Sequence, residues 1–449
     1  MVRLLPNISG YTRQLRQLRT THSFAGSVAV MLVGTVAGQA CSTLLSPVLT
    51  RLFTPTEFGN LSVYTATLTL LTTIASLGFE IAIPICLAEV DCANLMALCG
   101  VSLALTTGLA GLIAWFMPVD ILIRFSLGSL APCRYLLPLG LFCLGGYYIL
   151  VAVATRAGAF GTIARTRISQ GITGPCTQIL SGVLGVGTPG LVIGSIVGQS
   201  SGTVLLFIRF VLGQPEWLRQ ISWRRIAAVA RRFIRFPLYA GWGRLLDEAG
   251  GGLALSVLFA TCYSPAVAGF IFLSDRVVMR PLVMVSTSLL QVFTSEAGRA
   301  ASQNPVQLRR RFRQVVPLQF AISASWILVA NLSAPWAIPL LFGAKWASAT
   351  AYLHALSVAY LLQIVLHPVS STLQVLERQA TAITWQICRL ILIVAAIVLP
   401  WRAGLPAVTA LWISASTEAI CCLVLLALMA GAIQRVVVLQ RQNSAIEVG

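Results

Sequence analysis

Charged residues are scarce in this sequence of 449 residues, and acidic side chains are the scarcest. Only 10% of the residues are charged, with 13 Asp and Glu against 31 Lys and Arg. A soluble globular protein carries about 25% charged residues. The deficit argues against a water-soluble enzyme, because too little polar surface is left to coat a chain of this size. A mean hydropathy of +0.85 predicts a polytopic membrane protein instead.

Residues that bind metals lack the spacing of a metal site. The sequence has three histidines and eleven cysteines but no CxxC pair, and its closest grouping (Cys86, Cys92 and Cys99) has no histidine nearby. Cysteines in apolar surroundings are typical of small residues buried between packed helices. A nucleotide-binding loop is also missing. We therefore expect no metal, cofactor or disulfide framework, and we expect an ion gradient or mass action to supply any energy.

Long polar segments are lacking as well, while apolar runs recur from end to end. A membrane-spanning helix needs about 20 predominantly apolar residues. The stretches that meet this length are 24–50, 59–86, 93–117, 133–155, 162–186, 189–213, 236–261, 265–295, 315–342, 347–374, 380–399 and 404–432. Only the connections 214–235 and 296–314 are sizeable. The sequence predicts an all-α polytopic membrane protein with about twelve transmembrane helices.

Basic residues are distributed unequally between the two sides of this predicted topology. With residues 1–23 placed in the cytoplasm, 22 of the 31 basic residues fall on the cytoplasmic side and five on the other. This positive-inside bias predicts that the N and C termini are both cytoplasmic. It also explains the net charge of +18 without nucleic acid as a partner. The Arg-rich, acid-free tail leaves an organelle transit peptide as the alternative for its first residues.

The connection 214–235 is rich in arginine and also contains tryptophan. Such a segment suits an amphipathic helix on anionic lipid headgroups better than an RNA-binding element. Its arginines and tryptophans are Arg219, Arg224, Arg225, Arg231, Arg232, Arg235, Trp217 and Trp223. The predicted organisation is a cytoplasmic tail 1–23, a first lobe 24–213, a basic linker 214–235, a second lobe 236–432 and a cytoplasmic tail 433–449.

A short pattern occurs twice, 210 residues apart. Phe53-Thr54-Pro55 is followed by Gly59, and Tyr263-Ser264-Pro265 is followed by Gly269. In each case proline can begin a helix and the preceding hydroxyl can cap it. The placement predicts two six-helix lobes of parallel topology, related by a pseudo-twofold axis along the membrane normal, with a substrate cleft between them. Two unrelated helix starts are the alternative.

Ionisable residues cluster in the seventh and eighth predicted spans. Each costs at least about 2.5–3.5 kcal/mol within a span, so it normally faces a cavity or a partner. The cluster comprises Arg244, Asp247, Glu248, Asp275, Arg276 and Arg280, while Glu80, Arg389 and Glu418 are scattered.

Helical spacing gives this cluster two expected pairings. At matching depths, Arg244 approaches Arg280, and Asp247 approaches Arg276. One interpretation is a structural ion-pair network between the two spans. The other is an Arg-bearing cavity for an anionic headgroup, since the planar guanidinium binds two phosphate oxygens at once. Glu80 either snorkels or pairs with an arginine of the other lobe.

Several segments match a known family. SPVLTRLFTPTEFGNLSVYTA followed by FEIAIPICLAEVD resembles the polysaccharide biosynthesis (O-antigen flippase, Wzx-like) family of the multidrug/oligosaccharidyl-lipid/polysaccharide exporter superfamily. RFPLYAGWGRLLDEAG, AGFIFLSDRVVMRPLVMVSTSLLQVF and LLFGAKWASATAYL are similar to later family segments. The matching positions of the first two segments are Pro47, Arg51, Leu52, Phe53, Pro55, Phe58, Gly59, Glu80, Ala82 and Ile83.

The resemblance implies a non-enzymatic flippase in the bacterial inner membrane. Its expected substrate is a polyprenyl-diphosphate-linked oligosaccharide, a lipopolysaccharide, O-antigen or exopolysaccharide repeat unit. Its expected partners are membrane lipids and polysaccharide polymerase or assembly proteins, with no nucleic acid. The candidate substrate-binding residues are Arg244, Asp247, Glu248, Asp275, Arg276, Arg280 and Glu80.

Two other functions stay open at this stage. A drug or cation antiporter of the same superfamily predicts a cavity dominated by carboxylates. A membrane-embedded glycan ligase or polymerase predicts a large external loop that holds catalytic residues. The longest predicted outer loop, 118–132, has only Asp120 and Arg124 as charged residues, which argues against the second alternative.

Overall fold

The chain is almost entirely helical. The computed structural model describes residues 24–86, 88–118, 120, 128–213, 220–234, 242–303, 305–376 and 378–448. Within these ranges there is no strand, and eight helices are long and apolar enough to cross a membrane. The predicted class, an all-helical multi-pass membrane protein, is confirmed. The predicted tail 1–23 lies outside the described residues.

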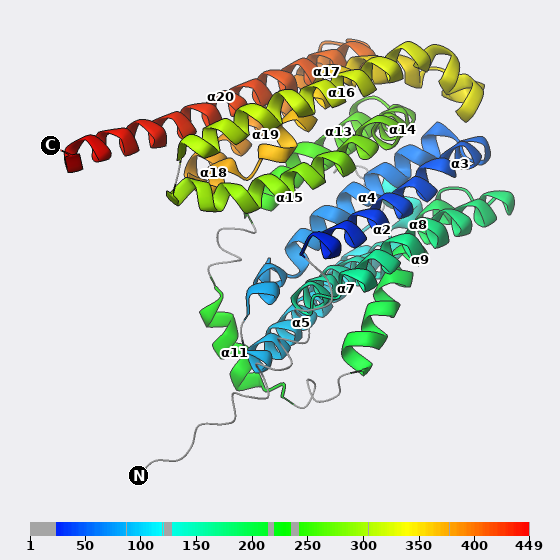
Figure 1. The fold of residues 1–449 in the computed structure, drawn as a ribbon. Helices are drawn as coiled ribbons and strands as arrows, with labels where there is room; N and C mark the ends of the chain where they lie inside the picture. The colour runs from blue at the N-terminus through cyan, green and yellow to red at the C-terminus, as the bar shows by residue number, and fades with distance from the viewer. Residues whose placement is uncertain are drawn as a thin grey trace.

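The first group of helices is drawn from blue to green in Figure 1. Helices α8 and α9 pack on each other, and α8 also packs on α2. The group consists of α2 (Phe24–Leu44), α3 (Ser46–Leu52), α4 (Pro55–Ala75), α5 (Glu89–Phe116), α7 (Leu136–Arg156), α8 (Phe160–Val183) and α9 (Thr188–Phe207), with short turns at Phe79–Ile85, Gly128–Cys133 and Ile208–Leu212.

The second group, drawn from green to red, lies beside the first (Figure 1). It consists of α12 (Trp242–Glu248), α13 (Ala254–Cys262), α14 (Pro265–Ser274), α15 (Arg280–Gln303), α16 (Pro305–Phe342), α17 (Ala349–Leu366), α18 (Thr372–Val375), α19 (Gln379–Arg402) and α20 (Ala407–Val448). A π-helical turn at Ala249–Leu253 joins α12 to α13, and another at Asp275–Met279 joins α14 to α15. The short 3₁₀ turns Ala344–Trp346 and His367–Val369 flank α17.

Within the described residues the predicted spans fall largely on helix, but several boundaries differ from the prediction. In the second range, expected to run to residue 86, α4 ends at Ala75 and the short turn Phe79–Ile85 follows, and the ninth range, expected to begin at residue 315, belongs to α16, which begins at Pro305. The eighth range, expected to end at residue 295, continues as α15 to Gln303. The twelfth range, expected to end at residue 432, continues as the single helix α20 to Val448. Polar and charged residues mark the end of an apolar run in the sequence, but the helix can continue past them, because its backbone hydrogen bonds do not depend on apolar side chains.

The repeated pattern begins two helices, as predicted. At α4, the Thr54 hydroxyl accepts a hydrogen bond from the Glu57 backbone N–H (3.3 Å), and the Glu57 carboxylate accepts one from the Thr54 backbone N–H (2.7 Å). This is a capping box. At α14, the Ser264 hydroxyl accepts from the Val267 backbone N–H (3.4 Å). Pro55 and Pro265 occupy the first turns of their helices, where no N–H donor is needed.

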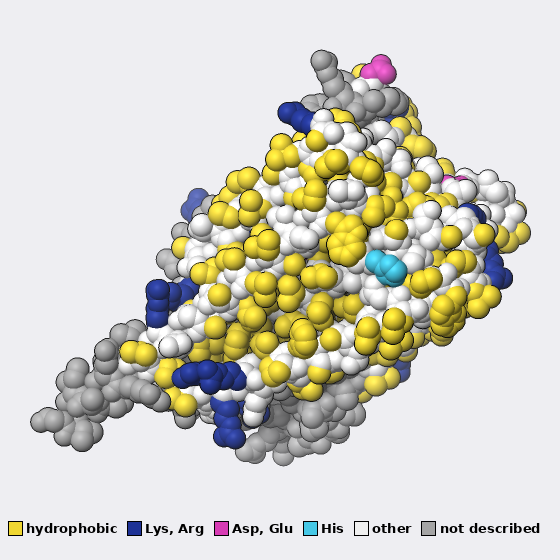
Figure 2. Space-filling view, turned by 90° about the horizontal axis from the view of Figure 1, so that it is seen from above, with side chains coloured by type: hydrophobic (Ala, Val, Ile, Leu, Met, Phe, Trp, Pro, Cys, Tyr) yellow, Lys and Arg dark blue, Asp and Glu magenta, His cyan; other side chains and the backbone are white. Residues whose placement is uncertain are grey.

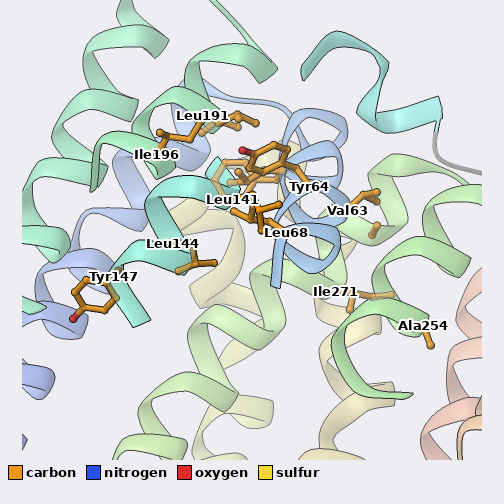
Figure 3. Close-up of a cluster of buried hydrophobic side chains, with 14 of the residues drawn as sticks. Val63, Tyr64, Leu68, Leu141, Leu144, Tyr147, Leu191, Ile196, Ala254 and Ile271 are labelled. Carbon is orange, nitrogen blue, oxygen red and sulfur yellow. The ribbon is translucent and has the colours of Figure 1, made fainter. Parts of the chain in front are cut away.

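A continuous hydrophobic core links the two groups. Figure 3 shows side chains from α4, α7 and α9 packed together, with Ala254 of α13 and Ile271 of α14 in the same cluster. Tyr64 of α4 is buried, and its hydroxyl donates to the Leu136 carbonyl at the start of α7 (3.0 Å). The hydroxyl of this buried tyrosine is therefore paired, as burial requires.

The outer surface of the molecule is largely apolar. Figure 2 shows a face covered by hydrophobic side chains, with lysine and arginine toward its margins. On α16, large apolar side chains are exposed every three or four residues, which puts them on one face of the helix. They are Leu328, Leu332, Trp336 and Leu340. A soluble protein rarely exposes so much contiguous apolar surface, whereas a membrane protein presents it to lipid.

The basic connection contains the helix α11 (Trp223–Arg232) within the described residues 220–234. Its apolar side chains Ile226 and Val229 are buried, and the helix packs on α5. Arg232 pairs with Asp91 of α5 (2.8 Å). The buried Asn94 of α5 accepts a hydrogen bond from the Ser222 backbone N–H (3.0 Å).

Candidate substrate cavity

A cavity of about 860 Å³ opens between α4 and the second group. On the α4 side it is lined by the small residues Ser62, Thr65, Ala66 and Thr69. Their spacing of three and four residues puts them on one helix face. The opposite wall comes from α12 to α15 and from α17 to α20, including the π-helical turn Ala249–Leu253. The cavity thus lies between one helix of the first group, α4, and the second group.

The α4 wall is polar, but its hydroxyls are already paired. Ser62 donates to Ser256 of α13 (2.8 Å), which joins the two groups at one end of the cavity. Thr65 and Thr69 donate to carbonyls one turn earlier in α4, at Leu61 and Thr65 (both 2.9 Å). This wall therefore adds mild polarity without adding charge.

The second group contributes a buried arginine held by two carboxylates. Arg389 of α19 binds Glu418 of α20 through Nε (2.9 and 3.0 Å to the two oxygens) and through Nη2 (2.7 Å). Its Nη1 reaches Asp247 of α12 at 3.3 Å. Gln363 also donates to Glu418 (2.8 Å), and the guanidinium lies 5.5 Å from the centre of the Trp385 ring. All five side chains line the cavity.

A second arginine faces the cavity from the start of α15. Arg280 donates from Nε to Asp275 (3.1 Å), and half of its side chain is exposed. Its guanidinium also lies 5.9 Å from the centre of the Phe272 ring. Arg280, Asp275 and Phe272 all line the cavity.

The described ionisable side chains of the cavity carry an excess of negative charge. Four carboxylates stand against two guanidinium groups: Asp247, Glu248, Asp275 and Glu418 against Arg280 and Arg389. His367 also lines the cavity, and its Nδ1 shares a hydrogen bond with Ser286 (3.1 Å). The lining is thus mixed, and a purely cationic anion site is not what these residues form.

The predicted site residues divide into those that face the cavity and those that do not. Asp247, Glu248, Asp275 and Arg280 line it. Arg276 is buried and donates from Nη2 to the carbonyl and hydroxyl of Ser42 in α2 (both 2.9 Å). The side chain of Arg244, in α12, lies outside the part of the chain that the structure describes.

The expected pairing of Asp247 with Arg276 is wrong. The ion pair of Asp247 is with Arg389, a residue that sequence reasoning left scattered. The physical reason is helix rotation. Consecutive residues of a helix point about 100° apart, so Asp275 faces the cavity while its neighbour Arg276 faces α2.

Glu80 is not among the residues that line the cavity. It lies in the short turn Phe79–Ile85, and its carboxylate accepts a hydrogen bond from the Ser76 hydroxyl (2.5 Å). This local bond accounts for part of its stabilisation within an apolar segment.

The residues of the family motif lie at a junction between the two groups. Pro47 lies in the first turn of α3, and Arg51 near its end donates to the Leu340 carbonyl of α16 (3.2 Å). The Arg51 carbonyl in turn accepts from Lys345 (3.0 Å). Burial lowers the pKa of Lys345, which stands in the turn between α16 and α17. Nearby, the buried Trp346 donates from its indole N–H to the Thr50 carbonyl (2.8 Å).

The two copies of the repeated pattern pack directly against each other. A methyl group added to Gly59 would overlap the Pro265 carbonyl, and one added to Gly269 would overlap the Pro55 carbonyl. Helices α4 and α14 therefore cross backbone to backbone, and only glycine fits at both positions.

Sequence reasoning missed the partnership of Arg389 and Glu418, although a signal was present. The two residues carry opposite charges in consecutive helices joined by a short turn. Arg389 lies 13 residues before the end of α19, and Glu418 lies 11 residues after the start of α20. Antiparallel neighbours with this connection place the two side chains at similar depth.

The fold is that of solved transporters of the MOP superfamily. An inward-facing multidrug resistance MATE family transporter of that superfamily superposes with a TM-score of 0.67, at 15% identity over 90% of this chain and 95% of that chain. An outward-facing one gives 0.55, at 14% identity over 92% and 96%. A MOP superfamily transporter from Pyrococcus furiosus, described as having a binding pocket of reversed polarity, gives 0.52, at 15% identity over 91% and 93%.

The family follows from the sequence match. A family model described as polysaccharide biosynthesis protein matches residues 48–351. The chain belongs to this polysaccharide biosynthesis family, as the motif resemblance predicted. No match is found among curated proteins.

Proposed function

We propose that this protein is a flippase that moves a polyprenyl-diphosphate-linked oligosaccharide across the bacterial inner membrane. The observation that carries the proposal is the cavity between α4 and the second group, with Arg280 and Arg389 in its wall, in a chain of the polysaccharide biosynthesis family. The substrate would be a repeat unit of lipopolysaccharide O-antigen or exopolysaccharide. Membrane lipids and polysaccharide polymerase or assembly proteins would be its partners.

The physical task needs no covalent chemistry. Moving a sugar and a diphosphate through hydrocarbon is costly because their hydrogen bonds and charges lose water. A hydrated cavity removes most of that cost while the lipid tail stays in the bilayer. Guanidinium groups suit the diphosphate, since they stay charged and can bind two oxygens at once. We therefore propose transport without an enzymatic step.

The proposed topology has twelve membrane-spanning helices in two parallel lobes, 24–213 and 236–432, with cytoplasmic termini. The basic segment 214–235 links the lobes, and 1–23 and 433–449 are the cytoplasmic tails. The reciprocal packing of Gly59 against Pro265 and of Gly269 against Pro55 supports a pseudo-twofold axis between the lobes. The arginine distribution supports the orientation.

The cavity would face the cytoplasm in this conformation. It is lined by residues near the end of α15 and the start of α19, Thr294 and Ala382, which lie on the side that the arginines assign to the cytoplasm. The close crossing of α4 and α14 supports closure of the opposite side. The higher TM-score with the inward-facing transporter than with the outward-facing one supports the same assignment.

One observation favours a second candidate, a drug or cation antiporter. Carboxylates outnumber guanidinium groups among the described ionisable residues of the cavity. Such a lining would attract a cationic substrate. We rank this second, because the match over residues 48–351 is to the polysaccharide biosynthesis family.

Reconstitution distinguishes the two candidates. The purified protein is inserted in liposomes that carry a labelled polyprenyl-diphosphate oligosaccharide, and exposure of the sugar is followed with a membrane-impermeant glycosidase. A flippase speeds the exposure of inner-leaflet sugar, and Arg280→Gln slows it. Arg310→Gln, at an exposed arginine of α16 outside the cavity, serves as the matched control and leaves the rate unchanged. Transport of a lipophilic cation with no sugar exposure would establish the antiporter instead.

A further inference from the structure

Arg389 is held by two carboxylates in very different ways. Glu418 binds the Nε and Nη2 side of the guanidinium at 2.7–3.0 Å. Both side chains are buried, with exposures of 8% for Arg389 and 7% for Glu418. Asp247 meets the remaining Nη1 at 3.3 Å and is 63% exposed. A charge-assisted hydrogen bond is normally about 2.7–2.9 Å long, so the Asp247 contact is the weak one.

The wall beside this guanidinium leaves room for a ligand. The π-helical turn Ala249–Leu253 contains three consecutive glycines, and all three line the cavity. A methyl group on Gly251 would come within 3.9 Å of Arg389 Nη2, and one on Gly252 would meet nothing within 4 Å. Glycine costs up to about 1 kcal/mol relative to alanine inside a helix. Three in a row are thus costly unless the missing side chains serve a purpose, and π-helical turns frequently occur at functional sites.

We propose that Arg389 binds the diphosphate of the substrate and that Asp247 is an internal competitor that occupies its Nη1 edge until substrate arrives. This inference rests on the proposed flippase function. Glu418 is the positioning residue: it fixes the guanidinium through Nε and Nη2 beside the glycine turn and leaves Nη1 to Asp247, which also lines the cavity. A phosphate oxygen replaces the Asp247 carboxylate at Nη1, and the released carboxylate turns to the hydrated cavity.

This exchange makes the carboxylate excess compatible with an anionic substrate. The empty cavity keeps Arg389 neutralised, which avoids an unpaired charge within the membrane. When the diphosphate binds, it takes the place of the Asp247 carboxylate as the second anionic partner of the guanidinium. Because Asp247 is exposed and its contact is long, an ion pair of this kind contributes little to stability, and a diphosphate with several oxygens can displace it.

The test compares two substitutions, each of which neutralises one of the two carboxylates that contact the Arg389 guanidinium. The full-length protein in nanodiscs is titrated with geranylgeranyl diphosphate, with geranylgeraniol as the uncharged control. Asp247→Asn removes the competitor and lowers the Kd by about three- to tenfold. Glu418→Gln loosens the guanidinium and raises the Kd by about tenfold, although simple electrostatics predicts tighter binding. Asp91→Asn, which removes the carboxylate paired with Arg232 outside the cavity, leaves the Kd unchanged.

The outcomes separate this inference from the proposed function. Unchanged or weaker binding in Asp247→Asn, with wild-type protein that binds the diphosphate and flips the oligosaccharide, overturns the competitor role alone. Equal tightening in Asp247→Asn and Glu418→Gln also overturns it, because both would then act through net charge. Wild-type protein that binds no diphosphate overturns this inference and the flippase together. Arg389→Lys, which keeps the charge and loses the planar fork, weakens binding if Arg389 is the ligand.

Discussion

Gly59 of α4 and Gly269 of α14 lie against each other's helix at one point of the fold. A methyl group on Gly59 would come 3.1 Å from the Gly269 backbone nitrogen and would overlap the Pro265 carbonyl. The same relationship holds in reverse for Gly269 and Pro55. Two glycines that lie 210 residues apart in the sequence thus set the separation of α4 and α14, one helix from each group.

Alanine at either glycine should force α4 and α14 apart. Overpacking of this kind typically costs about 1–3 kcal/mol, so Gly59→Ala and Gly269→Ala should lower the midpoint of thermal unfolding and slow transport. Gly100→Ala is the control, because a methyl group there meets nothing within 4 Å. Unfolding is followed by intrinsic fluorescence of the detergent-solubilised protein. An unchanged midpoint in both variants, equal to that of Gly100→Ala, would contradict the close crossing.

Arg276 and Arg280 should respond differently to charge reversal, although one turn of helix separates them. Arg276→Glu puts a carboxylate against the Ser42 carbonyl, where the buried guanidinium now donates two hydrogen bonds. Loss of such a buried partner costs about 3–5 kcal/mol, so the amount of folded protein should fall. Arg280→Glu replaces a half-exposed side chain of the cavity, so the protein should fold and lose diphosphate binding. Size-exclusion profiles and Kd values check the two expectations, and loss of binding with intact folding in Arg276→Glu would contradict this division.

Trp346 should matter for stability rather than for substrate binding. It is fully buried, its indole donates to the Thr50 carbonyl (2.8 Å), and its ring meets Phe58 and Phe270 edge-on at 5.1 and 6.0 Å between centroids. Trp346→Phe keeps most of the packing and loses the hydrogen bond, at about 1–3 kcal/mol. Trp346→Ala costs about 3–5 kcal/mol. The free energy of unfolding, measured by chemical denaturation, should fall from wild type to Trp346→Phe and again to Trp346→Ala. An equal loss of stability in both variants would show that the hydrogen bond alone matters.

The exposed arginines of α11 should govern association with anionic lipid. Arg224, Arg225 and Arg231 are exposed, and Arg232 is held by Asp91. Each basic residue near an anionic surface contributes about 1 kcal/mol. The triple change of Arg224, Arg225 and Arg231 to Gln should therefore reduce retention of phosphatidylglycerol, measured by native mass spectrometry, and high salt should reduce it in the wild type too. Retention of phosphatidylcholine is the control, and an equal loss of both lipids would argue against an electrostatic cause.

Much of the fold could be predicted because its signals lie within single segments. An apolar run of spanning length indicates a helix wherever the helix packs, and Pro55 and Pro265 mark helix starts through their own backbone chemistry. The arrangement of the site was harder to predict from the sequence. Asp247, Asp275 and Arg280 were expected to face a cavity, and they do. The partner of Asp247 was not identified, because pairing depends on the rotation and depth of three separate helices.

The sequence by itself determined the all-helical membrane class, the repeated helix starts and the family, because apolar length, proline position and local motifs need no knowledge of neighbours. Only the tertiary structure decided that Arg389, Glu418 and Asp247 meet, and that Arg276 turns from the cavity to Ser42. The physical reason is that the direction of a side chain depends on the rotation of its helix. A step of one residue turns a helical side chain by about 100°, and packing alone fixes which way each helix faces.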